Sequence, residues 1–191
     1  METFAQEKKQ RLTAAEYLER EATAEHKSEF YGGEVVAMAG AQEPHNAIVA
    51  NLIAELVFCL KKRGCRVYPS DQMLSLPDCE RYVYPDISVV CAPPKLEKHK
   101  GLDALLNPVL LVEVLSESTA QRDKSDKLDC YLSLDSLQEY ALIDSREQQV
   151  SVYRRTDAHN WNLRILDENT QNIELAGCTI ALTDIYRNVF E

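Results

Sequence analysis

The chain has 191 residues, 45% of them hydrophobic and 27% charged, a composition that excludes a disordered chain and predicts one folded domain over residues 1–191. The formal charge is −10, with 21 Lys and Arg against 31 Asp and Glu, which argues against tight nonspecific binding to a phosphate backbone. No apolar stretch is long enough for a membrane span, and residues 1–10 lack the apolar segment of a signal peptide. We therefore expect a cytoplasmic protein with no membrane partner.

The first predicted elements are a short helix, a hairpin and a long helix. Thr13 and Glu16 have capping-box spacing, which predicts a polar helix over residues 13–22. Gly32 and Gly33 stand between two strand-like runs, which is typical of a tight hairpin. Residues 44–62 are expected to form the main packing helix, because they place apolar side chains at helical spacing: Ile48, Leu52, Leu56 and Leu60, widened by Val49, Ile53 and Val57.

The second half of the chain predicts mainly strands. Residues 65–76 and 82–91 are expected to form two strands, residues 92–107 a loop, and residues 107–116 an apolar strand. A helix should follow over residues 116–134, with its second half docked on the sheet. Two strand pairs complete the order, at 139–144 with 149–155 and at 161–165 with 179–186. This order of elements predicts an α/β or α+β protein whose sheet has helices on its faces.

The cysteines and histidines give little support for a metal site. The six cysteines form no CxxC pair and no zinc spacing, and we expect most of them to be reduced core or surface thiols. The four histidines are scattered along the chain, so a site built from histidines is not indicated by their spacing.

Two carboxylates stand out by their context. Glu113 lies near the end of an apolar strand, so it either meets a cation or metal, or marks the point where the strand emerges into solvent. Asp86 follows Pro85 at the start of the preceding strand, where a simple turn is the alternative. If the two strands are antiparallel neighbours, both carboxylates converge on one point, as a hard divalent cation requires.

A lysine follows in the next predicted helix. Lys127 lies one turn before Tyr131, so its ammonium can reach back toward the strand ends. A lysine beside a metal-bound water can orient that water and stabilise charge on a phosphoryl transition state. The alternative is a solvated lysine that pairs with Asp123 or Asp126 at helical spacing.

Five segments occur in a characteristic order: YGGEVVAMAGAQEPHNAI, VYPDISVV, LLVEVLSEST, RDKSDKLDCY and EYALID. This ordered set, over residues 29–144, resembles the Uma family, which belongs to the PD-(D/E)XK or restriction-endonuclease-like superfamily. The resemblance implies an α/β (α+β) restriction-endonuclease-like fold, in which helices flank a central mixed sheet with an added N-terminal hairpin and C-terminal strands.

The resemblance also implies a catalytic site. Asp86 matches the acid of the PD motif, Glu113 matches the second acid, and the main-chain oxygen of Val114 matches a further ligand of Mg²⁺ or Mn²⁺. The superfamily lysine usually stands two residues after the second acid, where this chain has Leu115; the family carries it in the following helix, at a place that Lys127 matches better than Lys124.

Other positions of the resemblance have weaker implications. His45 matches a histidine at the start of a helix, where it could approach a phosphate, although an exposed helix end is the simpler interpretation. Glu34 is a further candidate ligand, or else a solvated strand residue. Ala141 replaces a tryptophan usual in the family, a difference that concerns packing. Ser116 and Thr119 most simply cap the helix that contains Lys127.

Three hypotheses follow. The first is a Mg²⁺-dependent endonuclease that acts on DNA. A homodimer would suit this activity, because cutting two strands favours two sites. The second is a catalytically degenerate member of the same fold that serves as a binding or regulatory module, which the acidic charge and the broken motif at Leu115 favour. The third is a metal-dependent hydrolase of another phosphoester, such as a nucleotide.

Overall fold

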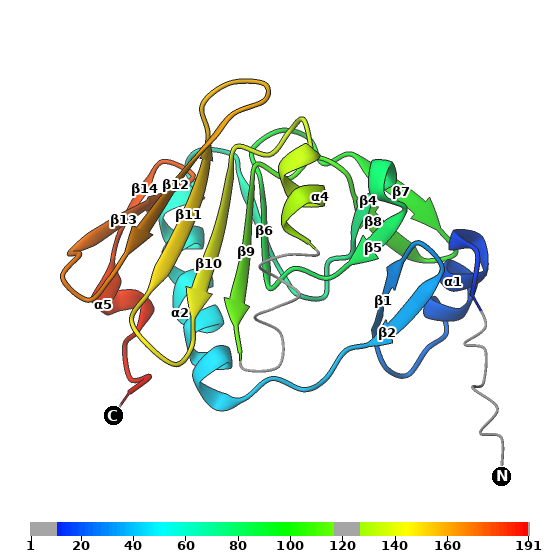
Figure 1. Cartoon of the computed structure of the whole chain (residues 1–191), viewed down its shortest axis with the longest axis horizontal. Helices are drawn as coiled ribbons and strands as arrows, with labels where there is room; N and C mark the ends of the chain where they lie inside the picture. Colours follow the sequence, from blue (N-terminus) through cyan, green and yellow to red (C-terminus); the bar gives the residue numbers. More distant parts are fainter. Residues whose placement is uncertain (1–10, 117–126, 191) are drawn as a thin grey trace, which may run out of the picture.

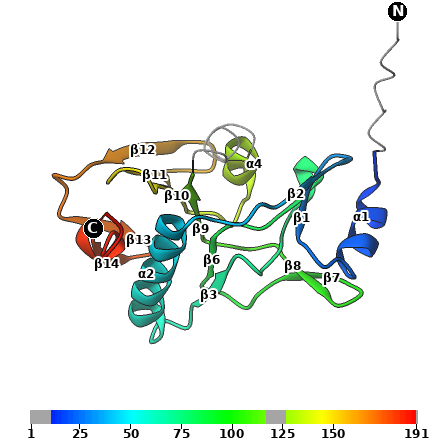
Figure 2. The same ribbon diagram turned by 90° about the horizontal axis from the view of Figure 1, so that it is seen from below.

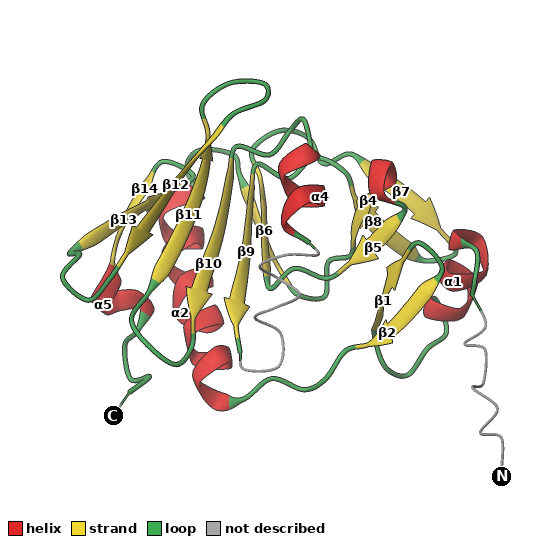
Figure 3. Cartoon of the chain, viewed as in Figure 1, coloured by secondary structure: helices red, strands yellow, loops and turns green. Residues whose placement is uncertain are grey.

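The computed structural model describes residues 11–116 and 127–190, which form two six-stranded sheets with helices packed against them (Figures 1 and 3). The main sheet has the strand order β12-β11-β10-β9-β6-β3, in which β9 and β10 are parallel and the other neighbours antiparallel. Its strands are β3 (Arg66–Pro69), β6 (Ile87–Val90), β9 (Leu110–Leu115), β10 (Glu139–Asp144), β11 (Val150–Arg155) and β12 (Trp161–Leu166).

The second sheet has the order β2-β1-β5-β4-β8-β7 and is also mixed, with β4 and β8 parallel. Its strands are β1 (Ser28–Tyr31), β2 (Glu34–Ala37), β4 (Leu74–Leu76), β5 (Arg81–Val83), β7 (Leu96–His99) and β8 (Leu102–Leu105). Helix α1 (Ala14–Glu21) packs against this sheet through an aromatic cluster that includes Tyr17, Phe30 and Tyr82.

The two faces of the main sheet are covered by different helices, α2 (Glu43–Leu60) on one and α4 (Leu128–Ser133) on the other (Figure 2). Strand β9 alternates between them: Leu110, Val112 and Val114 join the core under α2, whereas Leu111 and Leu115 join the core under α4. We refer to these as the α2 face and the α4 face. The α2 face is extended by β13 (Asn172–Leu175), β14 (Cys178–Ala181) and α5 (Leu182–Ile185).

Several predicted elements are confirmed. The capping box at Thr13 and Glu16 is formed, and the hairpin turns at Gly32 and Gly33, both with positive φ. The long helix buries Ile48, Leu52, Leu56 and Leu60 as expected, although Val57 is 46% exposed. Within the described residues, no helix combines the length and the apolar character needed to cross a bilayer.

The predicted strands at residues 65–76 and 82–91 are wrong as single strands. Each splits in two and is divided between the sheets: β3 and β6 belong to the main sheet, and β4 and β5 to the second. The chain turns at Pro69, whose carbonyl accepts a hydrogen bond from Gln72, and breaks again at Pro85, which has no N–H to donate to a ladder.

The predicted loop at residues 92–107 is also wrong, because it contains the β7–β8 hairpin. Lys100 and Gly101 both have positive φ at its turn, as a two-residue hairpin turn requires. Charged residues on the edge strand β7 conceal the strand pattern in the sequence, although such residues are common on edge strands.

The expectation of reduced thiols is contradicted. All six cysteines are paired, as Cys59–Cys178, Cys65–Cys91 and Cys79–Cys130. The partners are 119, 26 and 51 residues apart, so no local spacing in the sequence indicates the pairs. The pairing follows from the tertiary fold.

Candidate active site

The site begins with two facing strands of the main sheet. Strands β6 and β9 are antiparallel neighbours, with Ile87 opposite Val112 and Ser88 opposite Leu111. Asp86 directly precedes β6, and its carboxylate accepts the main-chain N–H of Val114, the residue after Glu113, at 2.7 Å. The two acids therefore belong to neighbouring strand ends.

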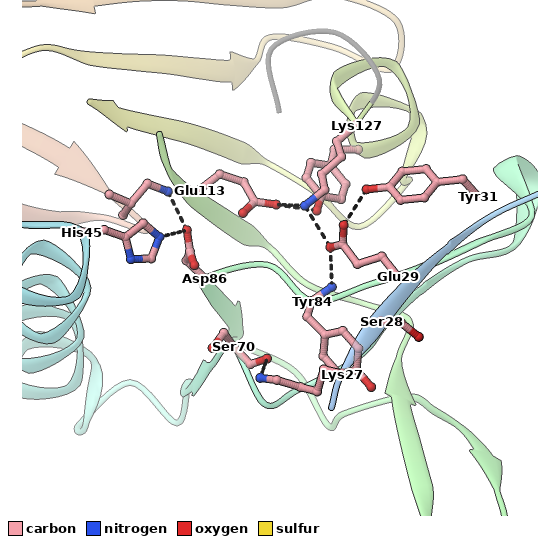
Figure 4. A network of polar contacts seen from close by, with 12 residues as sticks. Lys27, Ser28, Glu29, Tyr31, His45, Ser70, Tyr84, Asp86, Glu113 and Lys127 are labelled. Atoms are coloured by element: carbon pink, nitrogen blue, oxygen red, sulfur yellow. Dashed lines mark hydrogen bonds and ion pairs between the residues drawn. The ribbon is translucent and has the colours of Figure 1, made fainter. Parts of the chain in front are cut away.

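Glu113 meets a cation and is only 3% exposed. Its Oε1 accepts hydrogen bonds from Lys127 Nζ at 3.1 Å and from the Tyr131 hydroxyl at 2.7 Å (Figure 4). Lys127 is 5% exposed at the start of α4. The alternatives of a strand that surfaces at Glu113 and of a solvated Lys127 are therefore both wrong.

A second buried carboxylate, which the sequence did not single out, completes this cluster. Glu29 of β1 is 4% exposed, and its Oε1 lies 3.0 Å from Lys127 Nζ. Its Oε2 accepts from the Tyr31 hydroxyl at 2.6 Å, and its Oε1 accepts from the main-chain N–H of Tyr84 at 3.1 Å. The second sheet thus contributes to the site. Glu29 and Glu34 flank the same hairpin turn, and no sequence pattern distinguishes them. The tertiary structure does, because Glu29 is buried against Lys127 whereas Glu34 is exposed.

Asp86 lies at the more open end of the cluster, with its side chain 15% exposed. Its Oδ2 accepts the main-chain N–H of Val114 at 2.7 Å and lies 3.1 Å from His45 Nε2, at the start of α2 (Figure 4). The Asp86 carboxylate is therefore oriented by β9 and by α2 at once. His45, interpreted from the sequence as a partly exposed helix end, has a side chain that is 13% exposed and lies beside this acid.

Tyr131 is a fixed hydrogen-bond donor. Complete burial, reinforced by the negative charge of Glu113, raises the pKa of its hydroxyl well above the usual value. The phenol therefore stays protonated and orients the Glu113 carboxylate toward α4. The sequence assigned Tyr131 only to an apolar stripe.

The remaining positions lie as follows. Leu115 is buried on the α4 face, two residues after Glu113. The ammonium group on that face comes from Lys127 at the start of α4 and not from position 115. Ala141 is buried in the core under α2, and Glu34 is exposed on β2. Lys124 and Thr119 lie outside the described residues.

The oxygen atoms around Asp86 suit Mg²⁺, which keeps several water ligands, better than a metal ion whose ligands all come from the protein. Over residues 11–116 and 127–190, no three His, Cys, Asp or Glu side chains are grouped to hold a metal ion. Mg²⁺, however, commonly uses one or two carboxylates together with water and phosphate oxygens. Asp86 and Glu113 supply two carboxylates, and the Val114 carbonyl lies on the β6 side of β9 because its N–H points to Asp86.

A cavity of about 370 Å³ elsewhere contains none of these side chains. It is formed by β11, β12, β13 and β14 and is lined by residues that include Arg154, Asn162, Arg164 and Asn172. It contains no buried acid facing a buried cation. The cluster at the strand ends is therefore the stronger candidate for chemistry.

Residues 14–183 match the family model of Uma2, described as "Putative restriction endonuclease". Two proteins of Synechocystis sp. (strain ATCC 27184 / PCC 6803 / Kazusa) are similar to the chain. "Uncharacterized protein sll1609" is 39% identical over 161 residues, covering 84% of this chain and 90% of that protein. "Uncharacterized protein slr1290" is 31% identical over 183 residues, covering 94% and 93%.

One crystal structure, of "a putative nuclease belonging to DUF820" from Anabaena variabilis ATCC 29413, superposes with a TM-score of 0.73. It is 23% identical to this chain and covers 92% of this chain and 97% of its own. This similarity shows the fold, and the predicted restriction-endonuclease-like architecture, a mixed sheet flanked by helices, is confirmed. Because the family model spans most of the sequence, the chain belongs to the Uma2 family.

Proposed function

We propose that this protein is a nuclease that hydrolyses DNA phosphodiester bonds with Mg²⁺ or Mn²⁺ as cofactor. One observation carries the proposal: a buried lysine, Lys127, is held against Glu113, and the next residue, Val114, donates its main-chain N–H to Asp86. A cation beside two carboxylates at the ends of neighbouring strands is suited to phosphoryl chemistry. The Uma2 family is described as "Putative restriction endonuclease" and the similar Anabaena variabilis protein as "a putative nuclease", which supports the same activity.

In this proposal Asp86, Glu113 and the Val114 carbonyl hold the metal ion. The bound ion supplies a Lewis acid that neutralises phosphate charge and activates water. The hydrogen bond from Val114 N–H and the contact with His45 orient the Asp86 carboxylate before any ligand binds. Tyr131 does the same for Glu113.

Lys127 acts on the phosphate and the attacking water. Its ammonium donates hydrogen bonds, orients the water, and stabilises the negative charge that gathers on the phosphate oxygens. Water forms the new bond to phosphorus as the bond to the leaving sugar oxygen breaks. By resemblance to the superfamily, the products carry 5′-phosphates.

DNA cleavage by the purified chain tests the proposal. With Mg²⁺ or Mn²⁺ the wild type is expected to cut duplex or single-stranded DNA. Asp86→Ala and Lys127→Ala should each lower the cleavage rate by about a hundredfold or more. Asp71→Ala is a matched control, since this carboxylate is exposed and pairs only with Lys27 in the described contacts, and its rate should stay within about twofold. Cleavage that survives the Asp86 and Lys127 changes would refute the assignment.

A second candidate function is a binding or regulatory module without activity. It is favoured because one of the two Glu113 carboxylate oxygens, Oε1, already accepts from Lys127 and Tyr131. Calorimetric titration separates the two: an active enzyme should bind Mn²⁺, and Glu113→Gln should remove that binding. A wild type that binds no divalent ion would favour the inert module.

Substrate and assembly are separate tests. A panel of DNA, RNA and small phosphoesters distinguishes a nuclease from a hydrolase of nucleotides. A homodimer with two sites would suit cleavage of both strands, and sedimentation at several concentrations measures whether one forms.

A further inference from the structure

We propose that Glu29 is a positioning residue, which keeps the Lys127 ammonium in place when Glu113 turns to a divalent cation. This inference rests on the proposed function and deepens it. Glu29 and Glu113 approach the same Nζ from two different sheets, at 3.0 and 3.1 Å (Figure 4). Among the described residues Lys127 therefore has two counter-ions, Glu29 and Glu113, and only Glu113 lies on the strand that would hold the metal.

Glu29 is itself fixed independently of Lys127. The Tyr31 hydroxyl donates to its Oε2, and the Tyr84 N–H donates to its Oε1. Tyr84 lies two residues before Asp86, so Glu29 also contacts the segment that leads into the other acid of the site. The Glu29 carboxylate is thus pre-oriented by donors that do not change partner when a metal binds.

Glu113 is in the opposite situation. Its Oε1 is shared by Lys127 and Tyr131, and a divalent cation would compete with the ammonium for the Glu113 carboxylate. If Glu113 were the sole counter-ion, metal binding would leave a buried ammonium without a partner, which is strongly unfavourable. With Glu29 present, Lys127 keeps a carboxylate throughout.

The charges agree with this role. Asp86, Glu29 and Glu113 formally carry −3 and Lys127 carries +1, so the cluster totals −2, which matches a divalent cation. Without the Glu29 charge the total is −1, and Glu113 is the carboxylate partner that the ammonium keeps among the described residues. Loss of the Glu29 charge should therefore tighten the hold of Lys127 on Glu113 and weaken metal binding.

Glu29→Gln tests this, because the amide keeps the shape and an oxygen acceptor for Tyr84 N–H but removes the charge. In calorimetry the Kd for Mn²⁺ should rise about tenfold or more. The reason is that the lost Glu29 charge no longer draws the Lys127 ammonium away from Glu113, and close charges inside a protein interact by more than the 1.4 kcal/mol that a tenfold change represents. In cleavage assays kcat should fall, with little change in the KM for DNA. Glu29→Asp, which restores the charge on a shorter side chain, should bind Mn²⁺ more tightly than Glu29→Gln.

Glu21→Gln is the matched control. Glu21 is another buried carboxylate, 7% exposed, which accepts from Ser28 and from the hydroxyl of the same Tyr84. A purely structural effect of losing a buried carboxylate would appear in both variants. We expect the Glu21 variant to keep its Mn²⁺ affinity within about twofold. Equal losses in the two variants, or an unchanged affinity in Glu29→Gln, would overturn the inference.

A thermal-melting cycle separates failure of this inference from failure of the proposed function, because it needs neither metal nor DNA. Glu29→Gln should lower Tm in the wild-type background. In a Lys127→Met background it should raise Tm, because it removes one of two facing carboxylates that have lost their cation. The same loss of Tm in both backgrounds refutes the link between Glu29 and Lys127. A wild type that binds no metal refutes the proposed function and the metal part of this inference, whatever the cycle shows.

Discussion

The two faces of the main sheet are built on different principles. Under α2, strand β9 contributes Leu110, Val112 and Val114 to an apolar core. Under α4 the same strand contributes Glu113, which meets Lys127 and, through it, Glu29. One strand thus supports an apolar face that stabilises the fold and a charged face that holds the candidate chemistry.

The comparison distinguishes side chains that stabilise the fold from side chains that serve the proposed function. Burial of apolar surface is favourable in proportion to area, whereas a buried ion cluster is favourable only while every charge keeps its partner. The α2 face should therefore respond to lost volume. The α4 face should respond to lost charge balance, and that contrast can be measured.

The largest expected effect is at the charged face. Lys127→Met leaves Glu29 and Glu113 buried and facing each other without a cation, so the free energy of unfolding should fall by about 3–5 kcal/mol. Chemical denaturation measures it. Lys27→Met is the matched control, because this lysine is more exposed and pairs with an Asp71 that is 87% exposed; its change should stay below about 1 kcal/mol.

A triple variant sharpens that prediction. Glu29→Gln, Glu113→Gln and Lys127→Met together remove all three charges while the amides still accept from the Tyr84 N–H and from the Tyr131 hydroxyl. Such a variant should recover at least about half of the stability that Lys127→Met loses, since neutral replacement of a whole buried ion cluster is often tolerated. A triple variant less stable than the single one would show that charge balance is not what governs this face.

The sequence predicted one face better than the other. Helical spacing identified Ile48, Leu52, Leu56 and Leu60 in the α2 core, and the strand context of Asp86 and Glu113 identified both acids. Glu29 was missed because its partner is 98 positions away in the chain, and a strand with one glutamate has no special pattern. The disulfides and the division of β3–β6 between two sheets were missed for the same reason, since each depends on distant contacts.

The second effect is at the apolar face. Leu52→Ala removes a fully buried side chain of α2 and should lower the free energy of unfolding by about 3–4 kcal/mol through the lost transfer energy and the cavity. Val57→Ala, on the exposed side of the same helix, should change it by less than about 0.5 kcal/mol. Mn²⁺ binding by folded Leu52→Ala should match the wild type. If it does not, the two faces are not separable.

The disulfides provide a smaller test. Cys79–Cys130 ties α4, with Lys127 and Tyr131, to the short 3-10 helix Pro77–Cys79, whereas Cys65–Cys91 joins β3 to the end of β6. Removing either pair with alanine should lower the free energy of unfolding by about 2–3 kcal/mol. Only Cys79→Ala/Cys130→Ala should also slow DNA cleavage, because only that bond anchors the lysine helix. An equal loss of activity in both would contradict this assignment.

The smallest expected effect is the response to alkaline pH, which depends on buried tyrosines in the second sheet and on both faces of the main sheet. Burial, followed by the hydrogen bond to Glu97, raises the pKa of Tyr82 to about 12, and burial also raises the pKa of Tyr84 and of Tyr131. These neutral phenols are favoured by the fold, so their contribution to stability is complete below pH of about 10 and is lost as the pH rises from about 10 toward 12.

Denaturant midpoints measured between pH 8 and 11 should therefore fall above pH of about 10 in the wild type. Tyr82→Phe, which has no phenol to ionise, should lower the midpoint at pH 8 by loss of the Glu97 hydrogen bond and should flatten its decline at high pH. Leu52→Ala should lower the midpoint at every pH and keep the wild-type slope, because its loss is one of volume. A steeper slope in Leu52→Ala than in the wild type would mean that the apolar core also governs when the tyrosines ionise, and would contradict a loss of volume alone.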